Sequence, residues 1–114
     1  MLVTDMRMPV ILESPYKGDV ARNETYAKRC MRDSLDRGEA PFVSHMLYTR
    51  VLDDTNPDER LMGMKAGFSW IAPSTKTVVY TDYGISEGMR EGISLATILL
   101  HGVEFREIGK NQDK

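Results

Sequence analysis

Short apolar runs alternate with longer segments of helical periodicity along this chain, and this alternation limits it to an α/β fold. Residues 10–12 and 77–80 are compact runs rich in β-branched residues, as buried parallel strands require. Apolar residues in the segments between them recur three or four positions apart, which is typical of one helix face. The order of elements is β-α-β-α-β-α-β. We expect a small three-layer, doubly wound α/β fold, with a four-stranded, mainly parallel sheet in the order 2-1-3-4 and helices on both faces.

Caps and breakers set the expected boundaries. Asn56 followed by Pro57 predicts a helix start, and Ser86 is the expected cap of a later helix. The expected strands are 9–13, 42–46, 77–81 and 103–108. The expected helices are 20–37, a second one from Pro57 to Pro73, and a third one from Ser86 to His101. Their predicted buried faces carry Leu61, Met64, Phe68 and Ile71 in the second helix, and Met89, Ile93, Ala96 and Leu100 in the third.

Length and composition exclude several classes of protein. The chain has 114 residues, which suits one domain, with an ordered core expected at about 9–108. Its 15 basic and 17 acidic side chains give a net charge of −2, so we expect no nucleic-acid partner. We expect no membrane partner, because no apolar run is long enough to span a bilayer. The single cysteine, Cys30, is a predicted core residue and indicates the cytoplasm.

The predicted topology also says where a ligand would bind. Open α/β sheets bind ligands outside the carboxyl ends of their strands, where the strand order reverses. That point lies between the first and third strands, whose loops are 14–19 and 82–88. The candidate ligand-binding residues lie in or beside these loops and just past the second strand: Ser14, Pro15, Tyr16, Gly18, Asn23, His45, Asp82, Gly84, Ser86, Gly88, Met89 and Arg90.

Each candidate has a chemical role and a structural alternative. The helix start at Ser86, with Arg90, suits an anion, but Ser86 also fits a plain helix cap. Tyr16 offers a ring that stacks on a base, and Lys17 a charge for a phosphate, although both also suit an ordinary surface turn. Asn23 suits a sugar hydroxyl. The chain lacks the glycine patterns of dinucleotide and P-loop sites, and its histidines lack metal-ligand spacing, so we expect neither cofactor nor metal.

The second helix carries two features that bear on assembly. Gly63 and Gly67 lie four apart on one face, which permits close approach to the sheet or to a second subunit. Met62, Ala66 and Trp70 form a second apolar stripe. An oligomer interface and one well-buried helix explain this pattern equally well.

Three stretches together resemble a known family: 10–19 with Asn23, 38–41 leading to His45, and 82–89. In them the chain resembles the nucleoside 2-deoxyribosyltransferase-like superfamily, and more narrowly its small phage and bacterial proteins of unknown function. The resemblance implies a compact parallel α/β fold and a homo-oligomer in which a neighbour completes each pocket. It also implies a nucleoside held against a glutamate nucleophile, which forms a covalent glycosyl intermediate.

The chain departs from that family at the nucleophile. Related proteins commonly place a glutamate four positions after the glycine of a Gly-Met pair, and counting from Gly88 gives Gly92. Glu91 is one residue early, which turns it by about 100° on a helix, and Glu87 precedes the pair. The resemblance thus implies a pocket kept without its nucleophile.

The leading expectation is therefore a non-catalytic, phage-encoded nucleotide-binding protein of the host cytoplasm. It would bind, and could sequester, an immune signal derived from ADP-ribose or a cyclic nucleotide. The alternative is a transferase or hydrolase of N-glycosidic bonds, with Glu91 or Glu87 as its carboxylate. A third reading, a structural assembly subunit, depends on the Gly63 and Gly67 face. The expected partners are a small nucleotide or nucleoside-derived ligand and further copies of the chain.

Overall fold

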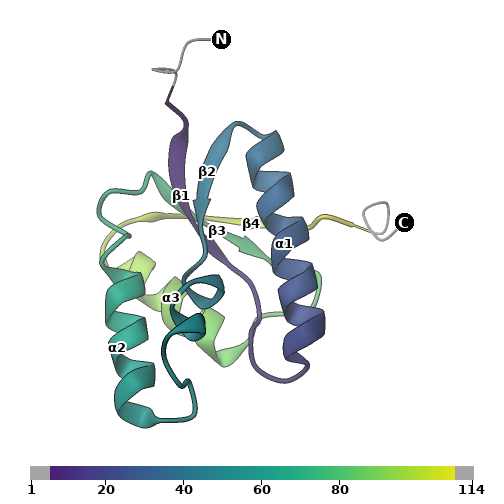
Figure 1. The fold of residues 1–114 in the computed structure, drawn as a ribbon. Helices are drawn as coiled ribbons and strands as arrows, with labels where there is room; N and C mark the ends of the chain where they lie inside the picture. Colours follow the sequence, from purple (N-terminus) through teal and green to yellow (C-terminus); the bar gives the residue numbers. More distant parts are fainter. Residues whose placement is uncertain (1–5, 110–114) are drawn as a thin grey trace.

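The computed structural model describes residues 6–109 and contains a four-stranded sheet between layers of helices (Figure 1). The strands are β1 (Met8–Glu13), β2 (Glu39–Phe42), β3 (Lys76–Tyr80) and β4 (Gly102–Arg106). All three pairings are parallel, and the strand order is β2-β1-β3-β4. The α/β class, the parallel sheet and the order 2-1-3-4 are confirmed.

Helices cover both faces of this sheet, as predicted. Helix α1 (Val20–Asp36) lies on one side, and α2 (Pro57–Phe68) and α3 (Glu87–Ile98) lie on the other (Figure 1). Two short 3-10 helices, η1 (Ser44–Met46) and η2 (Tyr48–Arg50), connect β2 to α2. The main apolar core lies between α1 and the sheet. Its buried residues are Val10, Leu12, Tyr26, Cys30, Val43, Val78 and Tyr80.

A buried ion-pair cluster lies on the α1 side of the sheet. Arg106 on β4 pairs with Glu39 on β2 through two contacts, Nη2 to Oε2 at 2.6 Å and Nη1 to Oε1 at 2.7 Å. Arg106 also donates to the Tyr80 hydroxyl at 3.2 Å, and that hydroxyl donates to Asp33 on α1 at 2.7 Å. Hydrogen bonds from Arg106 lower the pKa of Glu39 despite its burial. The cluster therefore ties β2, β3, β4 and α1 together.

The predicted helix starts are confirmed by their capping bonds. The Asn56 side chain accepts from the backbone N–H of Asp58 at 2.9 Å and of Glu59 at 3.2 Å. The Ser86 hydroxyl accepts from the backbone N–H of Met89 at 3.3 Å. Both helices therefore begin where the sequence places them.

The second strand and the helix ends differ from prediction. β2 begins at Glu39 instead of residue 42, because an edge strand tolerates Pro41, which lacks an N–H to donate. α2 ends at Phe68, five residues before Pro73. Leu61, which the sequence places on the buried face of this helix, is 50% exposed. α3 ends at Ile98, and Leu100 adopts a left-handed φ of 57° with its side chain 93% exposed.

The Gly63 and Gly67 face packs within the chain, against the η1–η2 segment. A Cβ atom at Gly67 would lie 2.9 Å from the Ser44 Cβ, and one at Gly63 would lie 3.3 Å from the Leu52 Cδ1. Within the chain, the close approach that these glycines permit is therefore to this segment and not to the sheet. It fixes α2 against the segment that carries His45.

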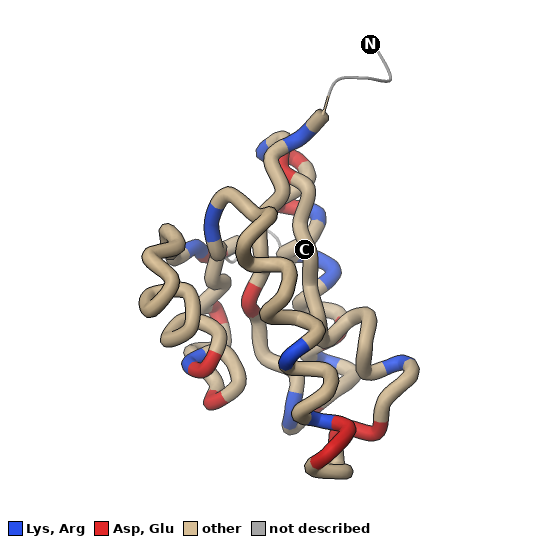
Figure 2. The backbone as a smooth tube through the Cα atoms, turned by 90° about the vertical axis from the view of Figure 1, so that its left-hand side faces the viewer, with Lys and Arg blue, Asp and Glu red and all other residues tan. Residues whose placement is uncertain are grey.

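Over most of residues 6–109 charges of both signs occur, but acids concentrate around the start of α2, at Asp53, Asp54, Asp58 and Glu59. Basic and acidic residues are interspersed along the backbone in Figure 2. Within the part of the chain that the structure describes, no helix combines the length and the apolar character needed to cross a membrane.

Candidate functional site

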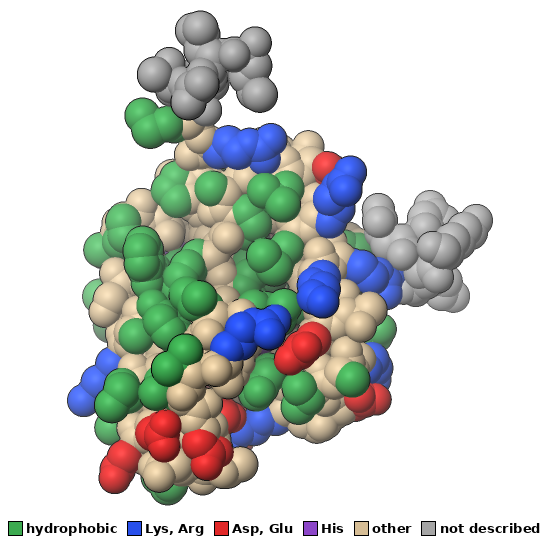
Figure 3. Space-filling model, viewed as in Figure 1, with side chains coloured by type: hydrophobic (Ala, Val, Ile, Leu, Met, Phe, Trp, Pro, Cys, Tyr) green, Lys and Arg blue, Asp and Glu red, His purple; other side chains and the backbone are tan. Residues whose placement is uncertain are grey.

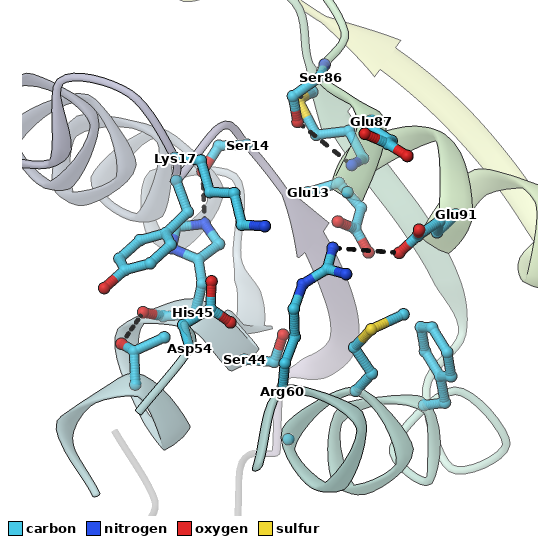
Figure 4. Close-up of a pocket in the computed structure, with 17 residues that line it drawn as sticks. Glu13, Ser14, Lys17, Ser44, His45, Asp54, Arg60, Ser86, Glu87 and Glu91 are labelled. Carbon is cyan, nitrogen blue, oxygen red and sulfur yellow. Dashed lines mark hydrogen bonds and ion pairs between the residues drawn. The ribbon is translucent and has the colours of Figure 1, made fainter. Parts of the chain in front are cut away.

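A cavity of about 320 Å³ opens where β1, η1, α2 and the first turn of α3 meet (Figure 4). β1 and its following loop contribute Glu13, Ser14 and Tyr16, and η1 contributes His45. The cavity thus lies at the carboxyl end of a central strand, where the predicted topology places a ligand. Its volume is at the lower end of the range for small-molecule sites.

The structure brings together more than half of the residues singled out from the sequence. Nine line the cavity: Ser14, Tyr16, Lys17, His45, Ser86, Glu87, Gly88, Met89 and Glu91. Six others do not line it: Pro15, Gly18, Asn23, Asp82, Gly84 and Arg90. The loop after β1 therefore faces the cavity, but most of the loop after β3 does not.

Asn23 and Asp82 are engaged elsewhere. The Asn23 amide donates to the carbonyls of Tyr16 at 3.0 Å and of Lys17 at 2.9 Å, which holds the loop after β1 in place. The Asp82 carboxylate accepts from the Tyr26 hydroxyl at 2.5 Å. Asn23 therefore does not line the cavity, but it holds the backbone of the loop that does.

Asp82 anchors the segment after β4. It accepts from the backbone N–H of Ile108 at 3.1 Å and of Gly109 at 3.0 Å. Burial alone would raise its pKa, but these bonds and the bond from Tyr26 outweigh burial and lower it. Of the remaining candidates, Arg90 is exposed, and Gly84 occupies a turn at φ 82°.

One wall of the cavity is a neutral histidine with two partners. The Ser14 hydroxyl and the His45 Nε2 atom lie 3.0 Å apart, and the Tyr16 ring centroid lies 5.6 Å from the His45 ring centroid. Desolvation lowers the pKa of His45 to about 4, so the imidazole is uncharged at neutral pH. Its Nδ1 atom is buried and has no hydrogen-bond partner within residues 6–109.

The opposite side of the cavity carries an ion pair that sequence reasoning missed. Arg60 on α2 reaches Glu91 on α3, with Nη2 and Oε2 3.8 Å apart (Figure 4). Met64 and Phe68 on α2 add an apolar surface. No motif marks Arg60, because its place depends on how α2 packs against η1.

Glu13 is the second residue that sequence reasoning missed. It is the last residue of β1, and its carboxyl group enters the cavity between the walls just described (Figure 4). Desolvation raises its pKa to about 8. A sequence signal did exist, since an acid ends an apolar β-branched run immediately before the loop predicted to bind a ligand.

Carboxyl groups outnumber cations among the cavity-lining residues. The acids are Glu13, Asp54, Glu87 and Glu91, and the cations are Lys17 and Arg60. Carboxylates accept hydrogen bonds from hydroxyl groups, while Lys17, Arg60 and the first turn of α3 can hold one small anion. The lining therefore suits a ligand rich in hydroxyls with little negative charge. Residues 6–109 bring no three potential metal ligands together.

The architecture and the cavity place the chain in a structural class. A 2-deoxyribosyltransferase from the psychrotolerant bacterium Bacillus psychrosaccharolyticus, described as a biocatalyst for the synthesis of antiviral and antitumoral nucleosides, has a similar structure with a TM-score of 0.69. The two share 14% sequence identity over 90% of this chain and 74% of that chain. This likeness shows that the chain shares the fold of that enzyme.

A family model gives the narrower assignment. The chain belongs to the family described as a domain of unknown function, DUF7768, whose model matches residues 8–106. No curated protein matches the sequence.

Proposed function

We propose that the cavity binds a nucleoside or a nucleoside-derived ligand and holds it intact. The observation that carries this proposal is a cavity of about 320 Å³, a size that accepts such a ligand. One of its walls is the neutral His45 with Ser14 and Tyr16, and the opposite wall is the Arg60–Glu91 ion pair with Met64 and Phe68. Tyr16, Met64 and Phe68 offer aromatic and apolar surface for a base. Asp54 and Glu91 offer acceptors for sugar hydroxyls. The similarity in fold to a nucleoside-processing enzyme supports the same ligand class.

The state of the Glu13 and Glu91 carboxyl groups favours binding over bond cleavage. A carboxylate that attacks a sugar must be ionised and free to move onto its target. Glu91 is paired with Arg60, and burial raises the pKa of Glu13 to about 8, which keeps its carboxyl group neutral at pH 7. Gly92, where a related glutamate is expected, has no side chain. We therefore propose a binding protein.

The ligand we favour carries little charge. Lys17 and Arg60 suit one phosphate, and the surrounding acids oppose a highly charged ligand. The finer form of this proposal is an ADP-ribose-derived or cyclic nucleotide signal, sequestered by a phage-encoded protein. Its support is the sequence resemblance to small phage and bacterial proteins of the superfamily. Of these two signals, a cyclic nucleotide with one phosphate fits the charge of the cavity better than ADP-ribose with its two.

The first test measures binding and ligand recovery together. We expect saturable binding of nucleosides, or of ADP-ribose, by calorimetry, and intact ligand after denaturation of the complex. Tyr16→Ala should weaken binding about tenfold, because base–aromatic stacking is lost. Asp36→Ala, on the exposed end of α1, is the matched control and should leave affinity unchanged. Release of free base would instead favour the alternative, cleavage or transfer of the N-glycosidic bond.

We also propose that α2 contacts a second copy of the chain near the cavity. Met62 and Trp70 are 58% and 46% exposed, and hydrophobic side chains gather over the left part of the face in Figure 3. Contiguous exposed apolar surface often marks a site of protein–protein contact. We expect light scattering to give a multiple of the 12.9 kDa chain mass. Met62→Glu should shift the mass toward one chain, whereas a wild-type mass of one chain would contradict the proposal.

A further inference from the structure

The Glu13 carboxyl group is a polar group at the centre of the cavity without a hydrogen-bond partner among residues 6–109. Figure 4 shows it between the Ser14–His45 wall and the Arg60–Glu91 pair. Within residues 6–109, no group donates a hydrogen bond to it or forms an ion pair with it, although Arg60 and Glu91 pair with each other. An ionised carboxylate without a partner is costly in such a place, so the neutral acid is the stable form.

Gly92 on α3 provides the space that this carboxyl group occupies. A Cβ atom at Gly92 would lie 2.2 Å from the Glu13 Oε2 and 2.7 Å from its Cδ. Any side chain at this position would therefore push the Glu13 carboxyl group aside. Because Gly92 is buried within a regular helix, the backbone itself gains nothing from glycine there. The glycine matters for the placement of Glu13.

We propose that Glu13, as a neutral carboxylic acid, donates a hydrogen bond to an acceptor atom of the ligand's base and so selects the ligand. A nucleobase carries such acceptors as ring nitrogens or carbonyl oxygens, and a protonated carboxyl group is both donor and acceptor. The other acids of the cavity are placed to accept, and Lys17 and Arg60 are charged donors that suit an anion. This inference rests on the proposed function, which supplies the ligand class.

The proposal has a consequence for pH. Burial raises the pKa of Glu13 to about 8, so the donor is present at neutral pH and is lost as the pH rises through that value. The charged and titratable groups that face it are Lys17 after β1, His45 on η1, Asp54 before α2, Arg60 on α2, and Glu87 and Glu91 on α3. His45, with a pKa of about 4, stays neutral throughout that range.

The experiment compares four proteins across pH. Adenosine, guanosine, cytidine and thymidine are titrated into the wild type, and the tightest binder is used for all variants from about pH 6 to about pH 9.5. Wild-type affinity should be constant below about pH 7 and fall by up to tenfold per unit above about pH 8. Glu13→Gln should keep most of the affinity and lose the decline, because its amide donates at every pH. Any decline left in this variant comes from the other groups facing Glu13 or from ionisation of the base itself.

Two further variants distinguish loss of the Glu13 hydrogen-bond donor from loss of the space that its carboxyl group occupies. Glu13→Ala should weaken binding at pH 7 by about tenfold, the loss expected for one buried hydrogen bond. Gly92→Ala should weaken it similarly while the melting temperature changes little, because only the flexible end of Glu13 has to move. Melting curves of all variants confirm that each is folded.

The possible outcomes distinguish this inference from the proposed function. If no nucleoside binds the wild type, the proposed function and this inference are both overturned. If a nucleoside binds but Glu13→Ala binds equally well, or wild-type affinity rises with pH, only the role of Glu13 is overturned. A carbon-13 NMR titration of the ligand-free protein adds a direct check. A Glu13 carboxyl group that ionises near its ordinary pKa, about 4.3, would contradict the donor role.

Discussion

Replacing Arg106 with methionine is expected to lower the free energy of unfolding by about 3–5 kcal/mol. Arg106 is 4% exposed in its side chain and holds both carboxylate oxygens of Glu39, whose side chain is 7% exposed. Without the guanidinium, the Glu39 carboxylate stays buried with the Ser34 hydroxyl as a donor and Lys76 3.7 Å away. Removing one partner of a buried pair is costly because the other charge remains. Chemical denaturation followed by circular dichroism measures the loss.

An exposed pair on α1 provides the control for Arg106. Arg32 and Asp36 are 3.0 Å apart, with side chains 78% and 64% exposed, so Arg32→Met should cost less than about 0.5 kcal/mol. Equal losses in the two variants would show that the Arg106 cluster adds nothing specific to stability.

The Arg106 cluster also predicts that the free energy of unfolding falls at acidic pH. Hydrogen bonds from Arg106, then from Lys76, lower the pKa of Glu104 to about 2, and the pKa of Glu39 is lowered as well. Groups with a depressed pKa stabilise the fold above their ordinary pKa, about 4.3, and lose that effect as the pH falls toward the folded value. Wild-type stability should therefore decline between about pH 4.5 and about pH 2, and Arg106→Met should flatten that decline.

Replacing Asp82 with alanine is expected to cost about 2–4 kcal/mol of stability and to leave nucleoside affinity within about twofold. Its carboxylate accepts from the Tyr26 hydroxyl and from the backbone N–H groups of Ile108 and Gly109. The Tyr26 side chain is 1% exposed, so the loss leaves a buried hydroxyl without its acceptor. Denaturation and calorimetry on the same preparation give both quantities.

Asp82→Asn is the matched variant, because its amide oxygen still accepts from backbone N–H groups. It should lose less stability than Asp82→Ala. A variant with normal stability and sharply weaker nucleoside binding would contradict the structural role. It would instead support the role of Asp82 as a ligand contact, which the sequence predicts.

The fold could be predicted from sequence because its signals are local. Caps such as Asn56 and Ser86 act on neighbouring amides, and the apolar runs at β1 and β3 are buried on both faces. β2 begins earlier than predicted because proline usually argues against a strand, whereas Pro41 lies on an edge strand that does not need its missing N–H. Leu100 has the right helical spacing, but it follows the end of α3 and faces solvent.

The location of the site could be predicted from the sequence, but only some of the residues that line it could. The loop after β1 and the first turn of α3 follow from the strand order, so Tyr16 and Ser86 were found. Arg60 joins the cavity through the packing of α2 against η1, which the Gly67 contact permits and no motif encodes. Glu13 enters through the space left at Gly92, a relation between residues far apart in the chain.

We propose above all that the cavity at the end of β1 binds a nucleoside-class ligand. The most direct test is a titration of the isotopically labelled protein with the four nucleosides and ADP-ribose, followed by amide chemical shifts. Binding in this cavity predicts saturable shifts concentrated at Ser14, Tyr16, His45, Gly88 and Glu91, around the cavity of Figure 4. Saturable shifts centred on the exposed end of α3, at Ile98 and Leu100, or no shift with any of these ligands, would contradict it.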